Sequence, residues 1–202
     1  MTWLAWLGAS YLLGAFPTSF VAGKLGRGID LREHGSKNLG ATNVFRILGW
    51  KYAIPVALVD VAKGGVPVAL FGAWSGLGGG WAAAFGAAAV LGHMFSPFVS
   101  FRGGKGVATA AGMFLALAPL AIAIALPVWG LCLWLTGYVS LSSIVAVVTF
   151  PVWVRLTAPA SLPALYASIG LALLIVFSHR ANIRRLLAGT ENRFRTRKEI
   201  HA

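Results

Sequence analysis

Apolar and polar positions alternate along the chain in long blocks. Apolar residues dominate six segments, at about 1–23, 50–73, 79–101, 106–137, 140–157 and 161–179. A helix needs about 20 mainly apolar residues to cross a hydrocarbon layer of about 30 Å, and most of these segments approach that length. The pattern therefore predicts an all-α fold, a polytopic integral membrane helix bundle.

The segment 106–137 decides the number of membrane spans. Its residues would form a helix of about 48 Å, which is too long for one perpendicular crossing. Pro119 and Pro127 can break it into two short spans, and this division gives seven transmembrane helices in total. One long tilted helix or a re-entrant piece would give five or six. We expect seven, in a single domain over residues 1–194 that is followed by a basic tail at 195–202.

Charged residues gather in a few islands between the apolar segments. The islands at 24–51, at 102–105 and after residue 180 are all net basic, so the positive-inside rule places all three in the cytoplasm. Seven spans then put the N-terminus in the periplasm and the C-terminus in the cytoplasm. The same path brings the turn 137–143 to the cytoplasmic side.

The composition narrows the possible partners. Charged residues make up 11% of the chain, whereas soluble domains carry about 25%. The net charge of +12 suits anionic lipid or anionic substrates, and no basic segment is long enough to indicate nucleic acid. The five carboxylates are scattered and no Cys/His cluster occurs, so we expect no metal site and no cofactor.

The first island contains a loop, Gly35 to Asn43, that is rich in glycine and hydrogen-bonding side chains. Glycines let backbone N–H groups approach an anion closely, and the N-terminus of a following helix adds a favourable dipole. Arg46 follows about one helical turn later, where its guanidinium can bind two phosphate oxygens. The alternative is an ordinary polar turn with helix-capping Ser and Asn residues.

The second island places Lys105 among Gly103, Gly104 and Gly106 at the start of an apolar helix, which is typical of a phosphate-binding loop. It is not a Walker A motif, because Val99 stands where that motif needs glycine and Gly106 where it needs Ser or Thr. A glycine-rich turn at the membrane interface with a snorkelling lysine is the alternative. His93, about ten residues earlier, suits a backbone hydrogen bond as well as catalysis.

The third island combines His179 and Asn182, which share one helical face, with several arginines and Glu191. A basic helix that binds anionic lipid headgroups would explain the arginines, but it would not explain His179, Asn182 or Glu191. Asp60 and Lys63, three residues apart within an apolar segment, are interpreted as a structural ion pair near the cytoplasmic end of the bundle.

Three segments resemble, in the same order, the three motifs of the PlsY family of bacterial membrane acyl-phosphate:glycerol-3-phosphate acyltransferases. They are GSKNLGATNVFR, GHMFSPFVSFRGGKGVAT and HRANIRRLLAGTEN. The stretch VDVAKGGVPV also resembles the family's sequence after the first motif, and the resemblance covers residues 1–194. Ser96-Pro97 departs from the family's usual Pro followed by an aliphatic residue. The tail 195–202 lies outside the motifs.

The resemblance implies an activity in phospholipid biosynthesis. An acyl group moves from acyl phosphate to the 1-hydroxyl of sn-glycerol 3-phosphate and gives lysophosphatidic acid and inorganic phosphate. The resemblance also implies seven helices in a bacterial inner membrane and a site open to the cytoplasm. The expected partners are the two substrates, the lipid bilayer and the enzyme that makes acyl phosphate, and we expect a monomer.

The reaction suggests a role for each candidate residue. We expect Arg46 and Lys105 to hold the phosphate of glycerol 3-phosphate, with Glu191 among the substrate-binding residues. Gly103, Gly104, Gly106 and Ser143 would receive the donor's phosphate or its carbonyl oxygen. Ser36, His179 and Asn182 would orient the attacking hydroxyl, with either His179 or a substrate phosphate as the base. His93 and Asn38 are secondary candidates.

Two other functions would also use basic loops and glycine-rich spans. A transporter or anion channel should place ionisable groups near the bilayer midplane on several helices, and only Asp60 and Lys63 approach that position. A structural protein that binds phospholipid would explain the basic tail, but it would explain neither the GGKG sequence nor the pair His179 and Asn182.

Overall fold

The computed structural model describes residues 2–78 and 80–194, and this part of the chain is helical, with turns and loops but no strands. The predicted tail, 195–202, lies outside the described residues. The structure confirms the all-α fold. The helices are α1 (Thr2–Ala15), α2 (Thr18–Arg27), α3 (Ala41–Leu48), α4 (Trp50–Val66), η1 (Pro67–Phe71), α5 (Gly72–Trp74), α6 (Gly80–Met94), η2 (Pro97–Val99), α7 (Val107–Leu117), α8 (Pro119–Thr136), α9 (Val139–Thr157), α10 (Leu162–Ser178) and α11 (Arg180–Leu187).

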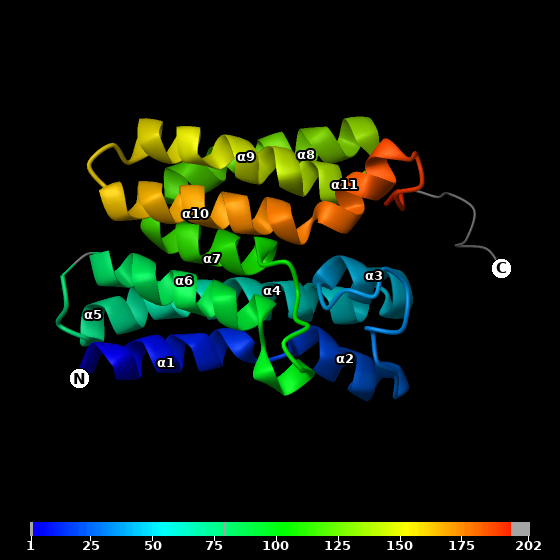
Figure 1. Cartoon of the computed structure of the whole chain (residues 1–202), viewed down its shortest axis with the longest axis horizontal. Helices are drawn as coiled ribbons and strands as arrows, with labels where there is room; N and C mark the ends of the chain where they lie inside the picture. Colours follow the sequence, from blue (N-terminus) through cyan, green and yellow to red (C-terminus); the bar gives the residue numbers. More distant parts are fainter. Residues whose placement is uncertain (1, 79, 195–202) are drawn as a thin grey trace.

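The long helices run roughly side by side and form two groups on either side of α7 (Figure 1). One group contains α1, α4 and α6, in which α1 packs mainly on α6 while α4 packs on α7. The other contains α8, α9 and α10, in which α9 packs on both of its neighbours. The short helices α2, α3 and α11 lie together at one end of the bundle.

Glycines allow two of these helix pairs to approach closely. A methyl group at Gly14 would overlap the carbonyl group of Ala89, where α1 meets α6. At the contact of α4 with α7, a methyl group at Gly64 would overlap the carbonyl of Thr109. Small residues at such crossings are typical of helices that pack in lipid, where van der Waals contact drives association.

The break at Pro119 is confirmed, because α7 ends just before it and α8 begins with it. Pro127 lies inside α8 and causes no second break. Within the described residues, five helical stretches are long and apolar enough to cross a membrane, and a sixth arises if α10 and α11, bent by 57°, count as one. With 11 residues, α7 is too short to span alone, so seven transmembrane helices stays a prediction.

The predicted turn over 137–143 is wrong in its extent. Only Gly137 and Tyr138 lie between α8 and α9, and Gly137 has a left-handed φ of 76°. Ser140, Ser142 and Ser143 belong to the first turns of α9 and are buried. They therefore face neighbouring helices from a fixed helical position.

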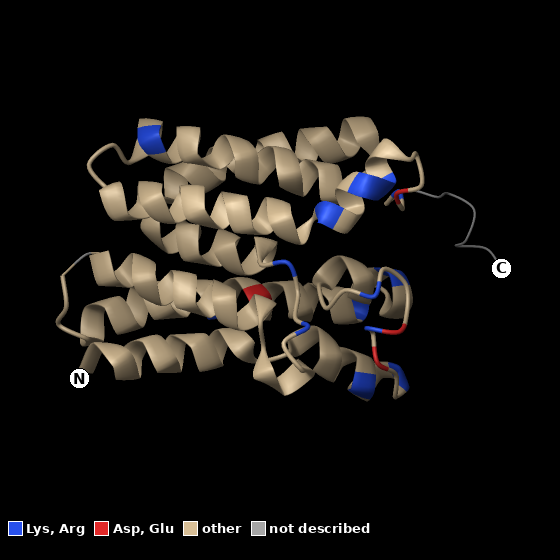
Figure 2. Ribbon diagram, in the orientation of Figure 1, with Lys and Arg blue, Asp and Glu red and all other residues tan. Residues whose placement is uncertain are grey.

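The three charge islands meet at one end of the bundle. Figure 2 shows Lys and Arg concentrated where α2, α3 and α11 lie, with an isolated basic segment at the opposite end. Arg155 lies in the last turn of α9, whereas Ser140 in the first turn of this helix contacts Glu191. Arg155 is therefore at the opposite end of α9 from the islands. The expectation that the islands share one side is confirmed, and the assignment of that side to the cytoplasm stays a prediction.

Candidate active site

The first loop is organised by a residue that the sequence did not single out. Asn43 is buried, with 1% of its surface exposed. Its Oδ1 accepts a hydrogen bond of 2.8 Å from the backbone N–H of Ser36. Its Nδ2 donates to the carbonyls of Leu31 and His34, both at 3.1 Å. Because these bonds satisfy backbone groups of the segment before α3, Asn43, in the first turn of α3, holds Ser36 in place beside this helix.

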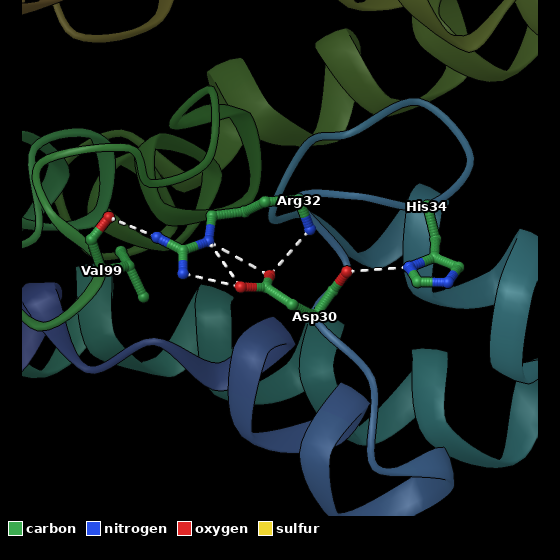
Figure 3. Close-up of polar contacts among 4 residues, drawn as sticks. All are labelled: Asp30, Arg32, His34 and Val99. Atoms are coloured by element: carbon green, nitrogen blue, oxygen red, sulfur yellow. Dashed lines mark hydrogen bonds and ion pairs between the residues drawn. The ribbon is translucent and has the colours of Figure 1, made fainter.

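A second set of contacts ties this loop to the lysine loop (Figure 3). Arg32 Nε donates to both carboxylate oxygens of Asp30, at 3.1 and 3.0 Å, and Arg32 NH1 donates to the carbonyl of Val99 at 2.9 Å. The hydrogen bonds from Arg32 lower the pKa of Asp30, so this pair stays ionised at neutral pH. The pair therefore links the loop before α3 to the loop after α6.

The lysine loop runs from η2 to α7 and rests on the end of α6. The backbone N–H groups of Gly103 and Gly104 donate to the carbonyls of Met94 and His93, each at 3.1 Å. A methyl group on either glycine would overlap His93. Gly106 adopts a left-handed φ of 85° and precedes the first turn of α7. Close packing therefore requires glycine at 103 and 104, and the backbone conformation favours glycine at 106. These requirements hold whether or not the loop binds an anion.

A polar network starts at Lys105 and joins three parts of the fold. Lys105 Nζ donates to Asn182 Oδ1, and Asn182 Nδ2 donates to Glu191 Oε1 at 2.7 Å. Ser140 Oγ donates to the same carboxylate oxygen at 2.9 Å, while Arg185 Nε donates to Oε2 at 2.7 Å. The carboxylate of Glu191 therefore binds α9 through Ser140 and α11 through Asn182 and Arg185. Asn182 in turn connects it to Lys105 in the lysine loop.

The charges of this network shift the pKa values of its members. Burial acts to raise the pKa of Glu191, but hydrogen bonds from Asn182, Arg185 and Ser140 outweigh it and lower the pKa. Burial lowers the pKa of Lys105 to about 8, with Glu191 acting in the opposite direction. Lys105 is thus a cation at neutral pH whose ammonium group is incompletely hydrated. An anion that binds there would stabilise this charge.

Arg46 joins the network from α3. Its NH2 donates to the carbonyl of Asn192 at 3.4 Å, and Glu191 and Arg185 are the charges that act on it most. Burial lowers the pKa of Arg46, although a guanidinium stays protonated at neutral pH. Arg46, Lys105 and Arg185 together face one carboxylate, so three positive charges minus one negative charge leave a local excess of two. Such an excess favours a phosphate group.

His179 lies at the bend between α10 and α11, with 3% of its surface exposed. Its Nδ1 lies 2.8 Å from the carbonyl oxygen of Ile175. A carbonyl only accepts hydrogen bonds, so we assign the proton to Nδ1, which leaves Nε2 unprotonated. The ring is therefore held in a tautomer that can accept a proton from a substrate hydroxyl.

The structure brings most of the expected site residues together and turns others elsewhere. Arg46, Lys105, Asn182 and Glu191 belong to one polar region that links α3, the lysine loop and α11, and His179 is the residue just before α11. Ser143 instead accepts a hydrogen bond of 3.3 Å from Trp129 Nε1, and its neighbour Ser140 contacts Glu191. Ser140, Arg185 and Asn43 were not among the site residues predicted from the sequence. Only the serine-rich start of α9 offered a signal for Ser140, since helical serines three apart share a face.

A metal site would need several His, Cys, Asp or Glu side chains close together. Within residues 2–78 and 80–194, no three His, Cys, Asp or Glu side chains are grouped so that they could hold a metal ion. The expectation that the reaction needs no metal stays a prediction, as do the individual roles of the site residues.

Both the sequence and the fold of this chain resemble known proteins. Residues 4–189 match the family described as glycerol-3-phosphate acyltransferase. This chain belongs to the glycerol-3-phosphate acyltransferase family. Family membership confirms the resemblance that the three motifs predicted, and with it an enzyme of phospholipid biosynthesis that is integral to a membrane.

Relatives in this acyltransferase family cover nearly the whole chain. The glycerol-3-phosphate acyltransferase of Trichlorobacter lovleyi is 46% identical over 95% of this chain and 97% of its own length. That of Chlorobium luteolum is 42% identical over 96% and 97%. A crystal structure of PlsY (YgiH), an integral membrane glycerol 3-phosphate acyltransferase, in its glycerol 3-phosphate form is 41% identical, with a TM-score of 0.90 over 97% of both chains. The lysophosphatidic acid form is 40% identical, with a TM-score of 0.87 over the same shares.

Proposed function

We propose that this acyltransferase moves an acyl group from acyl phosphate to the 1-hydroxyl of sn-glycerol 3-phosphate and releases lysophosphatidic acid and inorganic phosphate. The observation that carries the proposal is the polar network of Lys105, Asn182 and Glu191, with Arg46 beside it and an apolar cavity next to it. The related PlsY structures, in glycerol 3-phosphate and lysophosphatidic acid forms, support the acceptor and the product.

The apolar cavity lies between α7, α8, α9 and α10 and has a volume of about 90 Å³. It is lined at one end by Val107, which is two residues beyond Lys105, and by Ile175, whose carbonyl holds His179. Phe114 and Phe150 line it further along their helices. A site that is cationic at one end and apolar at the other suits a substrate with a phosphate group and an alkyl chain.

The chemistry needs little beyond positioning and charge stabilisation. Acyl phosphate is a mixed anhydride, so its phosphate is already a good leaving group. The hydroxyl oxygen of glycerol 3-phosphate attacks the acyl carbon, the bond from that carbon to the phosphate oxygen breaks, and the electron pair leaves with the phosphate. The hydroxyl proton passes to His179 Nε2 or to a substrate phosphate. Arg46 and Lys105 offset the charges of the phosphates, and Ser36 and Asn182 orient the hydroxyl.

The donor and the metal requirement can be tested in one assay. Purified protein in lipid nanodiscs would receive glycerol 3-phosphate with acyl phosphate, with acyl-CoA or with an acyl carrier protein thioester, each with and without EDTA. We expect lysophosphatidic acid and inorganic phosphate in equal amounts from acyl phosphate alone, unchanged by EDTA. Turnover with a thioester at a similar rate would overturn the proposed donor, and loss of activity in EDTA would reveal a metal.

The pKa of Lys105 predicts the pH dependence of the reaction. Its pKa in the free enzyme, about 8, lies below the ordinary 10.5, so the ammonium form predominates only below about pH 8. We expect kcat/KM for glycerol 3-phosphate to fall as pH rises through about 8. The basic limb of kcat should lie higher, because a bound phosphate stabilises the ammonium group. Coincident basic limbs in the two profiles would contradict this assignment.

The cavity predicts residues that limit acyl-chain length. The rings of Phe114 and Phe150 meet edge to face, with centroids 4.7 Å apart. Phe150→Ala should open space for a longer chain and raise kcat/KM for long donors relative to short ones by about tenfold. Leu173→Ala, on the exposed face of α10, is the matched truncation and should leave the preference unchanged. An unchanged chain-length profile in Phe150→Ala would place the acyl chain elsewhere.

The remaining expectations concern the setting of the enzyme. We propose that the charged end of the bundle faces the cytoplasm, because both substrates are anionic and the basic islands gather there. All the site residues proposed above come from one chain, which is consistent with a monomer. Since a mixed anhydride hydrolyses readily, functional coupling to the enzyme that makes acyl phosphate would limit loss of the donor.

A further inference from the structure

A buried charged cluster lies below the lysine loop and takes no part in the proposed chemistry. Asp60 Oδ1 accepts hydrogen bonds from Lys63 Nζ at 2.7 Å and from Thr18 Oγ1 at 3.0 Å. Lys63 Nζ also donates to the carbonyl of Phe16 at 3.1 Å, where the chain passes from α1 to α2. Asp60 and Lys63 have 2% and 4% of their surfaces exposed. The cluster therefore joins α2 and α4 inside the apolar part of the bundle.

His93 connects this cluster to the lysine loop. Its Nδ1 lies 3.7 Å from Asp60 Oδ1, and its Nε2 faces Gly104 so closely that a methyl group on this glycine would overlap it. The same methyl group would overlap the carbonyl of Leu39, in the loop that carries Ser36. Gly104 is thus the point where α6 and both phosphate-binding loops touch, and Lys105 is the next residue.

A small cavity lies against both Asp60 and His93. It has a volume of about 10 Å³ and is lined by Ser19, Asp60, His93 and the lysine loop. Ser19 Oγ is buried and has no hydrogen-bond partner among the described residues. The Asp60 to His93 distance of 3.7 Å is too long for a direct hydrogen bond, so both groups can still accept a partner from the side of the cavity. The cavity has the size of one water and offers it at least three polar partners.

Energetics argue that the cluster has a task other than stability. Charges within the membrane are costly, and a buried ion pair contributes little net stability compared with apolar residues of the same size. Asp60 and Lys63 both lie on α4, and their hydrogen bonds to Thr18 and to the carbonyl of Phe16 attach the start of α2 to this helix. Through His93, the same cluster reaches Gly104, the residue before Lys105.

We propose that Asp60, Lys63 and His93, bridged by one bound water at Ser19, form a positioning cluster that sets the place of the lysine loop. The cluster acts through Gly104 and touches no substrate. The proposal rests on the proposed function, because its effect is measured on the site for glycerol 3-phosphate. It also revises the expected role of His93, whose two ring nitrogens face Asp60 and Gly104 in place of a substrate.

The decisive variant is the double change Asp60→Asn with Lys63→Met, which removes both charges together. Because removal of a whole buried pair is often neutral for stability, the variant should fold with an unchanged or higher Tm. Its kcat/KM for glycerol 3-phosphate should nevertheless fall about 10- to 100-fold, mainly through KM, since a displacement near 1 Å has effects of this size. The basic limb of its pH profile should move from about 8 toward 10.5, because a displaced Lys105 regains water.

His93→Ala should show the same shift of the pH profile. The charges that act on Lys105, those of Glu191, Arg185 and Arg46, are unchanged in this variant, so the shift would report the position of the loop. Ser10→Ala, a buried serine of α1 that bonds its own helix at Trp6, is the matched control and should change neither quantity. A high-resolution structure should show one water within hydrogen-bond distance of Ser19, Asp60 and His93.

Each result separates this proposal from the proposed function. If the wild-type protein made no lysophosphatidic acid, the proposed function would fail. If the wild type were active and both variants kept its KM and pH profile, or lost activity only in proportion to Tm, the positioning role would be overturned. A dry cavity in the high-resolution structure would overturn the water site.

Discussion

Lys105→Ala is expected to reduce kcat/KM for glycerol 3-phosphate by about 10³-fold while the protein stays folded. Lys105 donates to Asn182, and the burial that lowers its pKa to about 8 also limits its hydration before substrate binds. A charged donor that meets a phosphate in such a place contributes several kcal/mol, because little water competes with it. Removal of that donor therefore affects both substrate binding and the charge that develops on the leaving phosphate.

The neighbouring Arg102→Ala is the control for Lys105→Ala. Arg102 lies in the same loop and has the same charge, but its side chain is exposed. It should change kcat/KM less than about threefold, mainly through a salt-dependent effect on the encounter with anions. Lysophosphatidic acid production would be measured for both variants at two ionic strengths. Equal losses would mean that general charge, and not the position of Lys105, controls the reaction.

His179→Asn is expected to lower kcat by about 10²- to 10³-fold with little change in KM. An asparagine amide can replace the Nδ1–H that donates to Ile175, so the bend between α10 and α11 should keep its geometry. It offers no nitrogen that can accept a proton, and loss of a general base has an effect of this size. Steady-state kinetics with varied glycerol 3-phosphate would separate kcat from KM.

Other outcomes for His179→Asn have distinct meanings. Equal effects on kcat and KM would indicate a binding role. A nearly normal kcat would indicate that a substrate phosphate takes the proton. His34→Ala serves as the control, because His34 is exposed in the loop before α3 and its ring bonds the carbonyl of Asp30. It should leave both constants near those of the wild type.

Local patterns were sufficient for the membrane fold and for the approximate location of the site. Block length and hydrophobicity determine whether a segment can cross lipid, and Pro119 stops α7 because proline cannot continue the hydrogen bonds of the preceding turn. The charge islands could be placed on one side because each is net basic and an even number of spans returns the chain to the same face of the membrane. Arg46, Lys105, His179 and Asn182 could be proposed as site residues because glycine spacing and helical spacing are local properties.

Contacts between elements could not be obtained in this way. Asn43 looks like any polar residue in a loop until its amide is seen to bind the backbone at Ser36, Leu31 and His34. Ser143 and Ser140 are three residues apart on one helix, and only the packing of α8 and α11 against α9 gives the first to Trp129 and the second to Glu191.

The sequence by itself determined that this protein is a helical membrane enzyme, and it predicted a cationic site formed by three charge islands that lie far apart along the chain. Its hydrophobic blocks, basic islands and motifs are properties of neighbouring residues, and such properties survive without knowledge of the fold. Only the tertiary structure decided that Glu191 joins Asn182, Ser140 and Arg185, and that His93 faces Asp60 beneath Gly104. The physical reason is that each helix is rotated and spaced by close packing with its neighbours, and this rotation selects the side chains that meet.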